Sequence, residues 1–394
     1  MAELCNKLFL FLSVWLTLCW IGCVDCVEEA HSVVNAHGIC GTFVWNRGYD
    51  CTEFIVPTKD GFLLAVQKMS NRASGTSRKE PVFLHHGLME GGQSWLLNEP
   101  KESVAFMLAD SGYDVWIANG RTTTFSYGHI TYNRAQKEFW DWKWDDLVEY
   151  DISSMLHFVN YMTGQPIYYV GYSQGAMSGF AAFTDNQISS LVKKAAMLSP
   201  VAYLNHVSSP LVTAAAWLFV DKVDILLDMY EFNLSSASET QLLQTICENT
   251  QIHCQDLDLL ALITGPSCCI NKSRNAYYSK YPESTSTKNL AQLAQLLRSG
   301  RFGKYDYELT GNLLHYGRTF PPSYDLSAIP KSLSFFLAHG GNDPLADSED
   351  VTQLAEKLPG KVKMLLMPNY NHGDMMLGTS AHTDVYPHIL KFFH

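Results

Sequence analysis

The sequence predicts an α/β fold, in which a mostly parallel sheet is covered by helices and a helical segment is inserted late in the chain. From about Cys51 onward, short runs of β-branched and aromatic residues alternate with amphipathic stretches, which is typical of parallel strands separated by helices. The stretch from Val207 to Leu314 interrupts this alternation, because it is rich in Leu, Ala, Met and Tyr at helical spacing and offers few strand candidates.

Seven apolar runs are strand candidates. They are Phe62 to Lys68, Pro81 to Leu84, Asp114 to Ala118, Pro166 to Gly171, Ala195 to Leu198, Leu333 to Ala338 and Val362 to Met367. Several are apolar at consecutive positions, as parallel strands buried on both faces are. We therefore divide the chain into an N-terminal extension (27–57), a first part of the core (58–206), a helical cap (207–314) and a second part of the core (315–394).

Composition excludes some classes of function. The 394 residues are 47% hydrophobic and 17% charged, which is ordinary for a globular protein. The formal net charge is −11, and no basic face is visible in the sequence. Since binding to nucleic acid depends on basic side chains that contact phosphates, we expect no nucleic-acid partner.

The first 26 residues are typical of a secretory signal peptide. Lys7 precedes an apolar run from Leu8 to Ile21, which is 14 residues long, and an acidic patch follows it. A membrane anchor is the weaker alternative, because a bilayer core requires about 20 apolar residues. We expect cleavage after Cys26, no transmembrane anchor in the mature chain, and a secreted or vacuolar protein.

Six cysteines remain after removal of the signal peptide: Cys40, Cys51, Cys247, Cys254, Cys268 and Cys269. An even number in a secreted chain favours disulfides, and the spacing fits no zinc site, so we expect no metal. The nearness of Cys40 to Cys51 in the chain predicts that they pair. A Cys268 to Cys269 bond is not expected, because adjacent Cα atoms lie about 3.8 Å apart and an unstrained disulfide spans about 4.4 to 6.8 Å.

Two crossed links from Cys247 and Cys254 to the Cys268 and Cys269 pair then remain, unless some of these thiols stay free. Two sequons, at Asn233 and Asn271, are candidate glycosylation sites in the same compartment. Each asparagine is otherwise an unmodified surface residue.

The motif that carries chemistry is Gly171-Tyr-Ser173-Gln-Gly175, which follows an apolar strand and opens a helix of small residues, Ala176 to Ala182. In this context G-x-S-x-G is the nucleophile elbow of the α/β-hydrolase fold, a sharp turn that exposes the serine oxygen at the sheet edge. The pattern predicts that Ser173 is a nucleophile.

An acid and a histidine should follow in that order, each just past the end of a later strand. Asp343 lies in a glycine-rich loop after the run that ends at Ala338, and His372 lies in the loop after Met367. His372 would take the proton of Ser173 while Asp343 fixes its tautomer. Asp347 is the competing acid, but its position is that of a helix start; His339, His382 and His388 are expected to be structural or solvated.

The oxyanion hole should combine two backbone N–H groups. One belongs to Gln174, the residue after the nucleophile. The other is expected in the loop Leu84-His-His-Gly-Leu88-Met, where Leu88 offers its N–H. We expect His85 and His86 only to hydrogen-bond loop carbonyls, because the hole needs backbone groups.

These residues resemble the eukaryotic acid lipases, the family of gastric and lysosomal acid lipase, and its plant members above all. The resemblance covers nearly all of the mature chain. Its landmarks here are Gly48-Tyr-Asp-Cys51-Thr-Glu53, Asp60-Gly-Phe62, His86-Gly-Leu88, Ser94-Trp-Leu-Leu-Asn98, Gly112-Tyr-Asp-Val-Trp-Ile-Ala-Asn119, Phe139-Trp-Asp-Trp142, Tyr150-Asp151, the elbow, Ser284-Thr-Ser-Thr-Lys-Asn289, Tyr305-Asp-Tyr307 and Asp343-Pro-Leu-Ala-Asp347.

The resemblance implies an α/β-hydrolase core with a helical cap over the site, which acts on acylglycerols or sterol esters without a cofactor. It carries the nucleophile to Ser173, the acid to Asp343, the base to His372 and the oxyanion donors to Leu88 and Gln174. The substrate is then a hydrophobic ester, taken up from solution or from a lipid interface.

The chain departs from the family pattern at four places near the site. It has Tyr172 before the nucleophile, Ala176 after the elbow glycine, Thr122 where Asn119-Gly-Arg121-Thr-Thr replaces the family's Asn-x-Arg-Gly-Thr, and Met375 where the family has an aromatic residue. These departures leave the alternative of an esterase or acyltransferase of specialised metabolism on a small hydrophobic ester. A lipid-binding protein without catalysis is a further alternative on the same fold.

Overall fold

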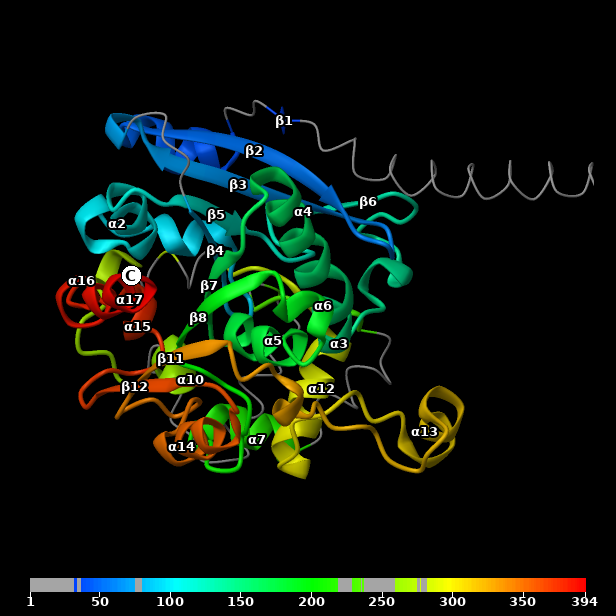
Figure 1. The fold of residues 1–394 in the computed structure, drawn as a ribbon. Helices are drawn as coiled ribbons and strands as arrows, with labels where there is room; N and C mark the ends of the chain where they lie inside the picture. The colour runs from blue at the N-terminus through cyan, green and yellow to red at the C-terminus, as the bar shows by residue number, and fades with distance from the viewer. Residues whose placement is uncertain are drawn as a thin grey trace, which may run out of the picture.

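The computed structural model describes residues 32–33, 37–74, 80–218, 229–234, 236, 259–274, 277 and 282–394. At its centre is a ten-stranded sheet of order β1-β2-β3-β5-β4-β7-β8-β11-β12, with β6 paired to β3 (Figure 1). Its strands are β1 (Ser32–Val33), β2 (Tyr49–Pro57), β3 (Phe62–Asn71), β4 (Pro81–His85), β5 (Asp114–Ala118), β6 (Gly128–His129), β7 (Ile167–Tyr172), β8 (Val192–Leu198), β11 (Ser334–Gly340) and β12 (Val362–Met367).

Six strands, from β5 through β4, β7, β8 and β11 to β12, run parallel, whereas β2, β3 and β5 pair antiparallel. This confirms the predicted fold class, and each of the seven predicted runs is a strand. Strand β2 lies in the stretch that the sequence analysis assigned to the N-terminal extension. It pairs with β3 from Tyr49 to Pro57, so the sheet begins before residue 58.

Helices cover both faces of the sheet (Figure 1). On one face pack α3 (Trp144–Asp146), α4 (Ser153–Thr163), α5 (Gln174–Ala182), α6 (Asn186–Ser189) and α14 (Ser348–Lys357), and on the other α2 (Val104–Asp110), α15 (Asp374–Leu377), α16 (Ala381–Asp384) and α17 (Tyr386–Phe393). Along β4 the side chains alternate between the two cores, since Phe83 belongs to the first, and Val82 and Leu84 to the second. Both faces are therefore apolar, as the unbroken apolar runs predicted.

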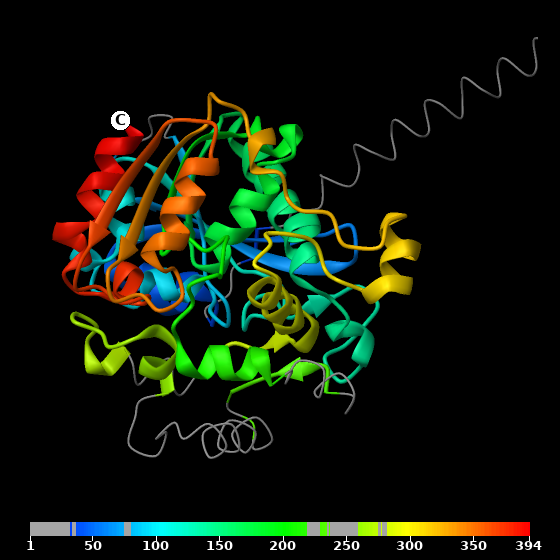
Figure 2. The same ribbon diagram turned by 90° about the horizontal axis from the view of Figure 1, so that it is seen from below.

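The segment between β8 and β11 includes the stretch for which the sequence analysis predicted a helical cap. Its described elements are α7 (Pro210–Trp217), α10 (Leu259–Thr264), α12 (Thr287–Ser299), α13 (Glu308–Tyr316) and the two-stranded pair of β9 (Glu231–Phe232) with β10 (Thr285–Ser286). Helix α7 packs against α10 and α12, outside the main sheet (Figure 2). The expected signal peptide and the pair Cys247 and Cys254 lie outside the described residues. No helix in the described ranges is long and apolar enough to cross a membrane.

The disulfides bear out one prediction and correct another. Cys40 bonds to Cys51 across a Cα separation of 5.4 Å, as expected. Cys268 bonds to Cys269, with Cα atoms 3.7 Å apart, so the prediction that this bond would not form is wrong, and neither residue is left to pair with Cys247 or Cys254.

Cα spacing alone was an insufficient criterion for the Cys268 to Cys269 bond. The backbone bends at Cys268 and Cys269, and the bend is held by one local and one long-range hydrogen bond. The N–H of Cys268 donates to Asp374 Oδ2 at 3.2 Å, and the N–H of Cys269 donates to Ser267 Oγ at 3.1 Å. These contacts fix a local geometry in which the two side chains meet.

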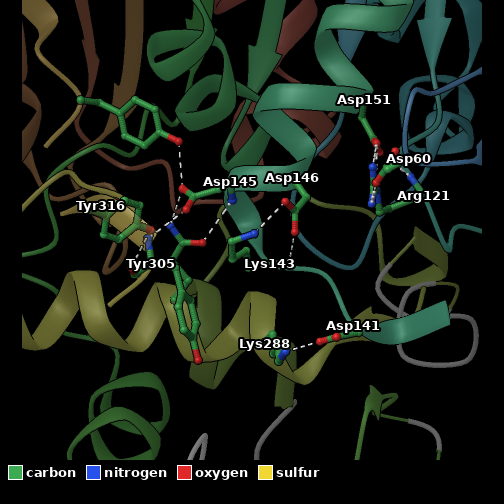
Figure 3. A network of polar contacts seen from close by, with 12 residues as sticks. Asp60, Arg121, Asp141, Lys143, Asp145, Asp146, Asp151, Lys288, Tyr305 and Tyr316 are labelled. Carbon is green, nitrogen blue, oxygen red and sulfur yellow. Dashed lines mark hydrogen bonds and ion pairs between the residues drawn. The ribbon is translucent and has the colours of Figure 1, made fainter. Parts of the chain in front are cut away.

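A buried ion pair joins the loops beside the sheet edge (Figure 3). The Arg121 side chain is fully buried; its Nε donates to Asp151 Oδ1 at 2.8 Å and its Nη1 to Asp60 Oδ2 at 2.7 Å. The guanidinium also lies 4.1 Å from the centre of the Phe62 ring. Breaking such a pair leaves an uncompensated buried charge, so Arg121 fixes these loops and has a structural role.

Candidate active site

Ser173 occupies the sharp turn between β7 and α5. Its backbone has φ 52° and ψ −117°, a conformation that residues other than glycine rarely adopt. Two glycines permit this turn: a Cβ on Gly171 would lie 2.8 Å from the backbone of Ala176, and one on Gly175 would lie 2.3 Å from the carbonyl oxygen of His85. The elbow is therefore packed directly against the loop that follows β4.

A hydrogen-bonded chain runs from this serine into the sheet. His372 Nε2 lies 2.8 Å from Ser173 Oγ, and His372 Nδ1 lies 2.9 and 3.0 Å from the two carboxylate oxygens of Asp343. His372 and Asp343 are buried, whereas Ser173 is partly exposed. The structure thus brings together the three residues predicted to act together, with the serine on the accessible side.

The carboxylate is held in its ionised form. Burial alone would raise the pKa of Asp343, but the His372 imidazole and two backbone N–H groups outweigh burial and hold the pKa below its usual value. Those groups belong to Leu345 and Ala346, which donate to Asp343 Oδ1 at 2.9 and 2.8 Å. The competing acid Asp347 caps α14 by accepting from the N–H of Glu349, as its position predicted.

The backbone of His372 is anchored on three sides. Its N–H donates to the carbonyl of Thr264 in α10 at 3.1 Å, and its carbonyl accepts from Ser199 Oγ at 2.9 Å and from the Tyr172 hydroxyl at 3.3 Å. The family departure at Tyr172 therefore contributes an anchor for the candidate base. The departures Ala176, Thr122 and Met375 are buried as well, so all four lie in the protein interior.

The loop after β4 presents Leu88 beside the elbow. Among hydrogen bonds between described residues, none uses the backbone N–H of Leu88 or of Gln174. The neighbouring Gly87 is held at both ends, since its N–H donates to Glu90 Oε2 at 3.1 Å and its carbonyl lies 2.9 Å from His86 Nδ1. The N–H of Gln174, next to Ser173, and that of Leu88, in the loop packed against the elbow, are therefore candidate donors to a developing oxyanion.

The His86 ring is neutral and its tautomer is determined by its partners. Its Nε2 accepts from the N–H of Gly120 at 3.0 Å, so Nδ1 carries the proton that is donated to the Gly87 carbonyl. Burial lowers the pKa of His86 to about 4 and that of His85 to about 3. His85 Nδ1 contacts the Tyr169 hydroxyl at 2.9 Å. Only His86 holds a loop carbonyl, so the expectation for His85 is corrected.

Of the histidines that the structure describes, His372 is the one hydrogen-bonded to Ser173, and His339 and His382 have other partners. His339 is buried with Nδ1 3.3 Å from Ser348 Oγ, and His382 Nδ1 lies 2.6 Å from the carbonyl of Thr379. Within the described part of the chain, the one group of three possible metal ligands is Cys268, Cys269 and Asp374, and its two sulfurs are joined to each other. These thiols are not available as thiolate ligands while the bond is closed.

Comparison with known proteins identifies the family. The α/β hydrolase fold family matches residues 80–379, and the partial α/β-hydrolase lipase region matches residues 40–99. Triacylglycerol lipase 1 of Arabidopsis thaliana is 40% identical over 92% of this chain and 91% of its own length. This chain belongs to the acid lipase family. Gastric triacylglycerol lipase of Homo sapiens, another member, is 33% identical over 87% of this chain and 88% of its own.

Solved structures agree with the family at the level of the fold. A thermostable carboxyl esterase from Bacillus coagulans superimposes with a TM-score of 0.58 at 14% identity, covering 88% of this acid lipase chain and 98% of its own. A monoglyceride lipase from Saccharomyces cerevisiae gives 0.56 at 14% identity, covering 86% and 94%. At these identities the likeness shows the α/β-hydrolase fold alone.

Sequence reasoning missed the residues that support the site. Glu90 and Glu283 are neither part of the elbow nor spaced by any periodicity, and Asn289 entered only as the last residue of a family landmark. In the structure Glu90 accepts from the N–H of Gly87, Glu283 from Gln93 Nε2 and Asn289 from Gln174 Nε2. Their partners lie 3, 190 and 115 residues away in the chain, so no local pattern indicates the two long-range contacts.

Proposed function

We propose that this protein hydrolyses hydrophobic carboxylic esters, acylglycerols foremost, through an acyl intermediate on Ser173. The observation that carries the proposal is the continuous hydrogen-bonded chain from Ser173 through His372 to Asp343, which is set at a strained turn. The backbone N–H groups of Leu88 and Gln174, which no hydrogen bond between described residues uses, add to its support. That arrangement serves nucleophilic acyl transfer.

In the first half of the reaction, Ser173 Oγ attacks the ester carbonyl while His372 Nε2 takes its proton. The carbonyl oxygen becomes an oxyanion that accepts hydrogen bonds from the N–H groups of Leu88 and Gln174. Asp343 holds Nδ1–H and stabilises the imidazolium. His372 then returns the proton to the leaving alkoxide, and the alcohol departs.

In the second half, water takes the place of the alcohol. His372 removes its proton, hydroxide adds to the acyl carbonyl, and Ser173 leaves with the proton that His372 returns. Each step moves protons and forms or breaks C–O bonds between the ester, water and side chains of this chain. No step transfers an electron, and we propose no cofactor.

The substrate class follows from relatives and from the cap. Relatives of 30 to 40% identity include proteins named triacylglycerol lipase. At the end of α7, Trp217 and Leu218 are 56% and 51% exposed, which supports contact with an apolar substrate or a lipid surface. Because all four departures from the family are buried, they give little support to a small-ester specialist. We propose that residues 207–314 form the cap that receives the acyl chains.

We propose a secreted or vacuolar location. The Cys40 to Cys51 disulfide fits an oxidising compartment. Of the two sequons, Asn271 is exposed, whereas Asn233 Nδ2 donates to Ser284 Oγ at 3.0 Å. We propose Asn271 as the principal glycosylation site.

The test uses purified Ser173→Ala with wild type as the reference, on trioctanoylglycerol and on a short soluble ester. We expect the variant to keep its thermal midpoint and to lose both hydrolysis and labelling by a fluorophosphonate probe, because alanine removes the nucleophile and little packing. Undiminished labelling of the variant would remove Ser173 from the mechanism. A labelled wild type that transfers acyl groups to an alcohol and not to water would instead indicate an acyltransferase.

A further inference from the structure

The loop that carries Leu88 is held at each neighbouring peptide group. Glu90 accepts from the N–H of Gly87, His86 donates to the carbonyl of Gly87, and the carbonyl of Met89 accepts from the N–H of Glu283 at 3.1 Å. Met89 itself has φ 56°, so its peptide needs an external partner to stay in place. Glu283, which makes this contact, lies within the predicted cap segment (207–314).

The side chain of Glu283 fastens this contact to the core. The residue is 5% exposed; its Oε1 accepts from Gln93 Nε2 at 2.7 Å, and its Oε2 accepts from the N–H and hydroxyl of Thr124 at 2.7 and 2.9 Å. All three groups donate a hydrogen to the Glu283 oxygens, an arrangement that favours the ionised carboxylate. Gln93 and Thr124 belong to two different loops of the core, so Glu283 joins both to the Met89 peptide.

The same segment reaches the second donor. Asn289, fully buried in the first turns of α12, accepts from Gln174 Nε2 at 3.0 Å through Oδ1 and donates to Thr285 Oγ1 at 2.9 Å. Gln174 is the residue after the nucleophile. One short stretch, Glu283 to Asn289, thus contacts Met89, which follows Leu88, and Gln174 itself.

We infer that Glu283 is a positioning residue for the oxyanion hole, fixing the Leu88 N–H through Met89, and that Asn289 does the same for Gln174. This inference rests on the proposed function, since it assigns Glu283 a part in the same reaction. It also means that the cap and the bond-breaking step are mechanically connected.

The connection predicts a particular kinetic signature. The Leu88 N–H acts on the oxyanion, which exists only in the transition state and the tetrahedral intermediate, so loosening it affects the bound ground state little. Loss of a whole donor costs roughly 100- to 1000-fold in kcat in comparable sites. If the donor is still present but less firmly positioned, kcat should fall by less, about tenfold.

The experiment compares Glu283→Ala with wild type on a short soluble ester, whose acyl chain does not depend on the cap. We expect kcat to fall about tenfold with KM within about twofold. Affinity for a trifluoromethyl ketone, which adds to Ser173 and forms an oxyanion, should fall by the same factor. Affinity for the matching secondary alcohol, which cannot form one, should not change.

The matched control is Asp145→Ala, because Asp145 is an equally buried carboxylate at the same junction. It is 5% exposed and accepts from Gln292 Nε2 at 2.7 Å and from the N–H of Tyr305 at 2.9 Å, and Gln292 lies three residues after Asn289 in α12 (Figure 3). Within the part of the chain that the structure describes, its partners Gln292, Tyr305 and Tyr324 form no hydrogen bond with the loop of Leu88. We expect this variant to lose thermal stability while its ketone-to-alcohol affinity ratio stays at the wild-type value.

Glu283→Gln tests the same point if the alanine variant does not fold. Gln93 Oε1 has no hydrogen-bond partner among the described residues. If the Gln93 amide rotates, this oxygen can accept from the new NH₂ group and retain most of the contact. The expected loss of ketone affinity is then about threefold. An unchanged ketone-to-alcohol ratio in the folded Glu283 variant, or an equal fall in the Asp145 variant, overturns the inference. A wild type without esterase activity or probe labelling would overturn the proposed function instead.

Discussion

Replacing Asp343 by Asn gives the sharpest test of how the site holds its proton. Asp343 Oδ1 accepts from the N–H groups of Leu345 and Ala346, so the amide NH₂ of an asparagine cannot take that place without opposing two donors. The NH₂ group is therefore forced to the Oδ2 position, 2.9 Å from His372 Nδ1. His372 must then accept at Nδ1 and carry its proton on Nε2, where it can no longer take the proton of Ser173.

The size of the loss follows from the wrong tautomer. In related triads this substitution costs roughly four orders of magnitude in kcat, equivalent to about 5 kcal/mol of transition-state stabilisation. The control is Asp347→Asn. Asn is as good a helix N-cap as Asp, so this variant should keep activity within about twofold and stability within about 0.5 kcal/mol.

The assay is hydrolysis of a short soluble ester under substrate saturation, with active sites counted by a fluorophosphonate probe. Thermal unfolding of each variant verifies that it is folded. A kcat for Asp343→Asn within about tenfold of wild type would refute the tautomer argument. A greater loss in Asp347→Asn than in Asp343→Asn would transfer the role of the acid to Asp347.

Three further predictions follow from the packing and charge around the elbow. Gly175→Ala places a Cβ 2.3 and 2.6 Å from the carbonyl oxygens of His85 and His86, so we expect a loss of about 1 to 3 kcal/mol in unfolding free energy and a marked fall in kcat. Gly112→Ala, at φ +91° with no atom within 4 Å of the new Cβ, should cost about 1 kcal/mol and leave kcat unchanged; equal kcat in both variants would contradict the clash. Burial raises the pKa of Glu90 to about 8, so the folded protein keeps a proton that the unfolded chain releases near pH 4.5, and stability from this group falls as pH rises between these values. In Glu90→Gln the slope of unfolding free energy against pH over this range should become less negative, by at most about 1.4 kcal/mol per pH unit, and an unchanged slope in chemical denaturation would show that Glu90 titrates normally. Trp217→Ser combined with Leu218→Ser should slow hydrolysis of emulsified trioctanoylglycerol several-fold and spare a soluble ester, whereas Ile130→Ser, at a residue 72% exposed next to β6, should spare both; equal rates on the emulsion for all variants would remove α7 from the lipid contact.

The sequence anticipated the elements in which chemistry is local. The elbow is recognisable from Gly171, Ser173 and Gly175. A turn at φ 52° needs small neighbours on both sides, so the whole requirement falls within five consecutive residues. The loops of Asp343 and His372 follow recognisable strands, so the parallel topology brings them to the same sheet edge. Buried strands appear as apolar runs, and all seven predicted runs are strands.

Tertiary packing decided what no short stretch encodes. Strand β2 was not anticipated, because its burial is irregular along its length and its place depends on pairing with β3. The bond between Cys268 and Cys269 contradicted a rule about Cα spacing, and the bend there is held in part by Asp374, 106 residues further along the chain. These outcomes depend on atoms brought together from distant parts of the chain.

The amino-acid sequence by itself determined the fold, the family and the identity of the candidate nucleophile, acid and base, because strand burial and the strained turn impose constraints on neighbouring residues. Only the tertiary structure decided how the oxyanion region is held. Glu283 meets Gln93 across 190 residues and Asn289 meets Gln174 across 115. No periodic pattern in the sequence indicates hydrogen bonds over such separations. Their energy depends on a geometry that exists only after the sheet and the predicted cap segment have packed together.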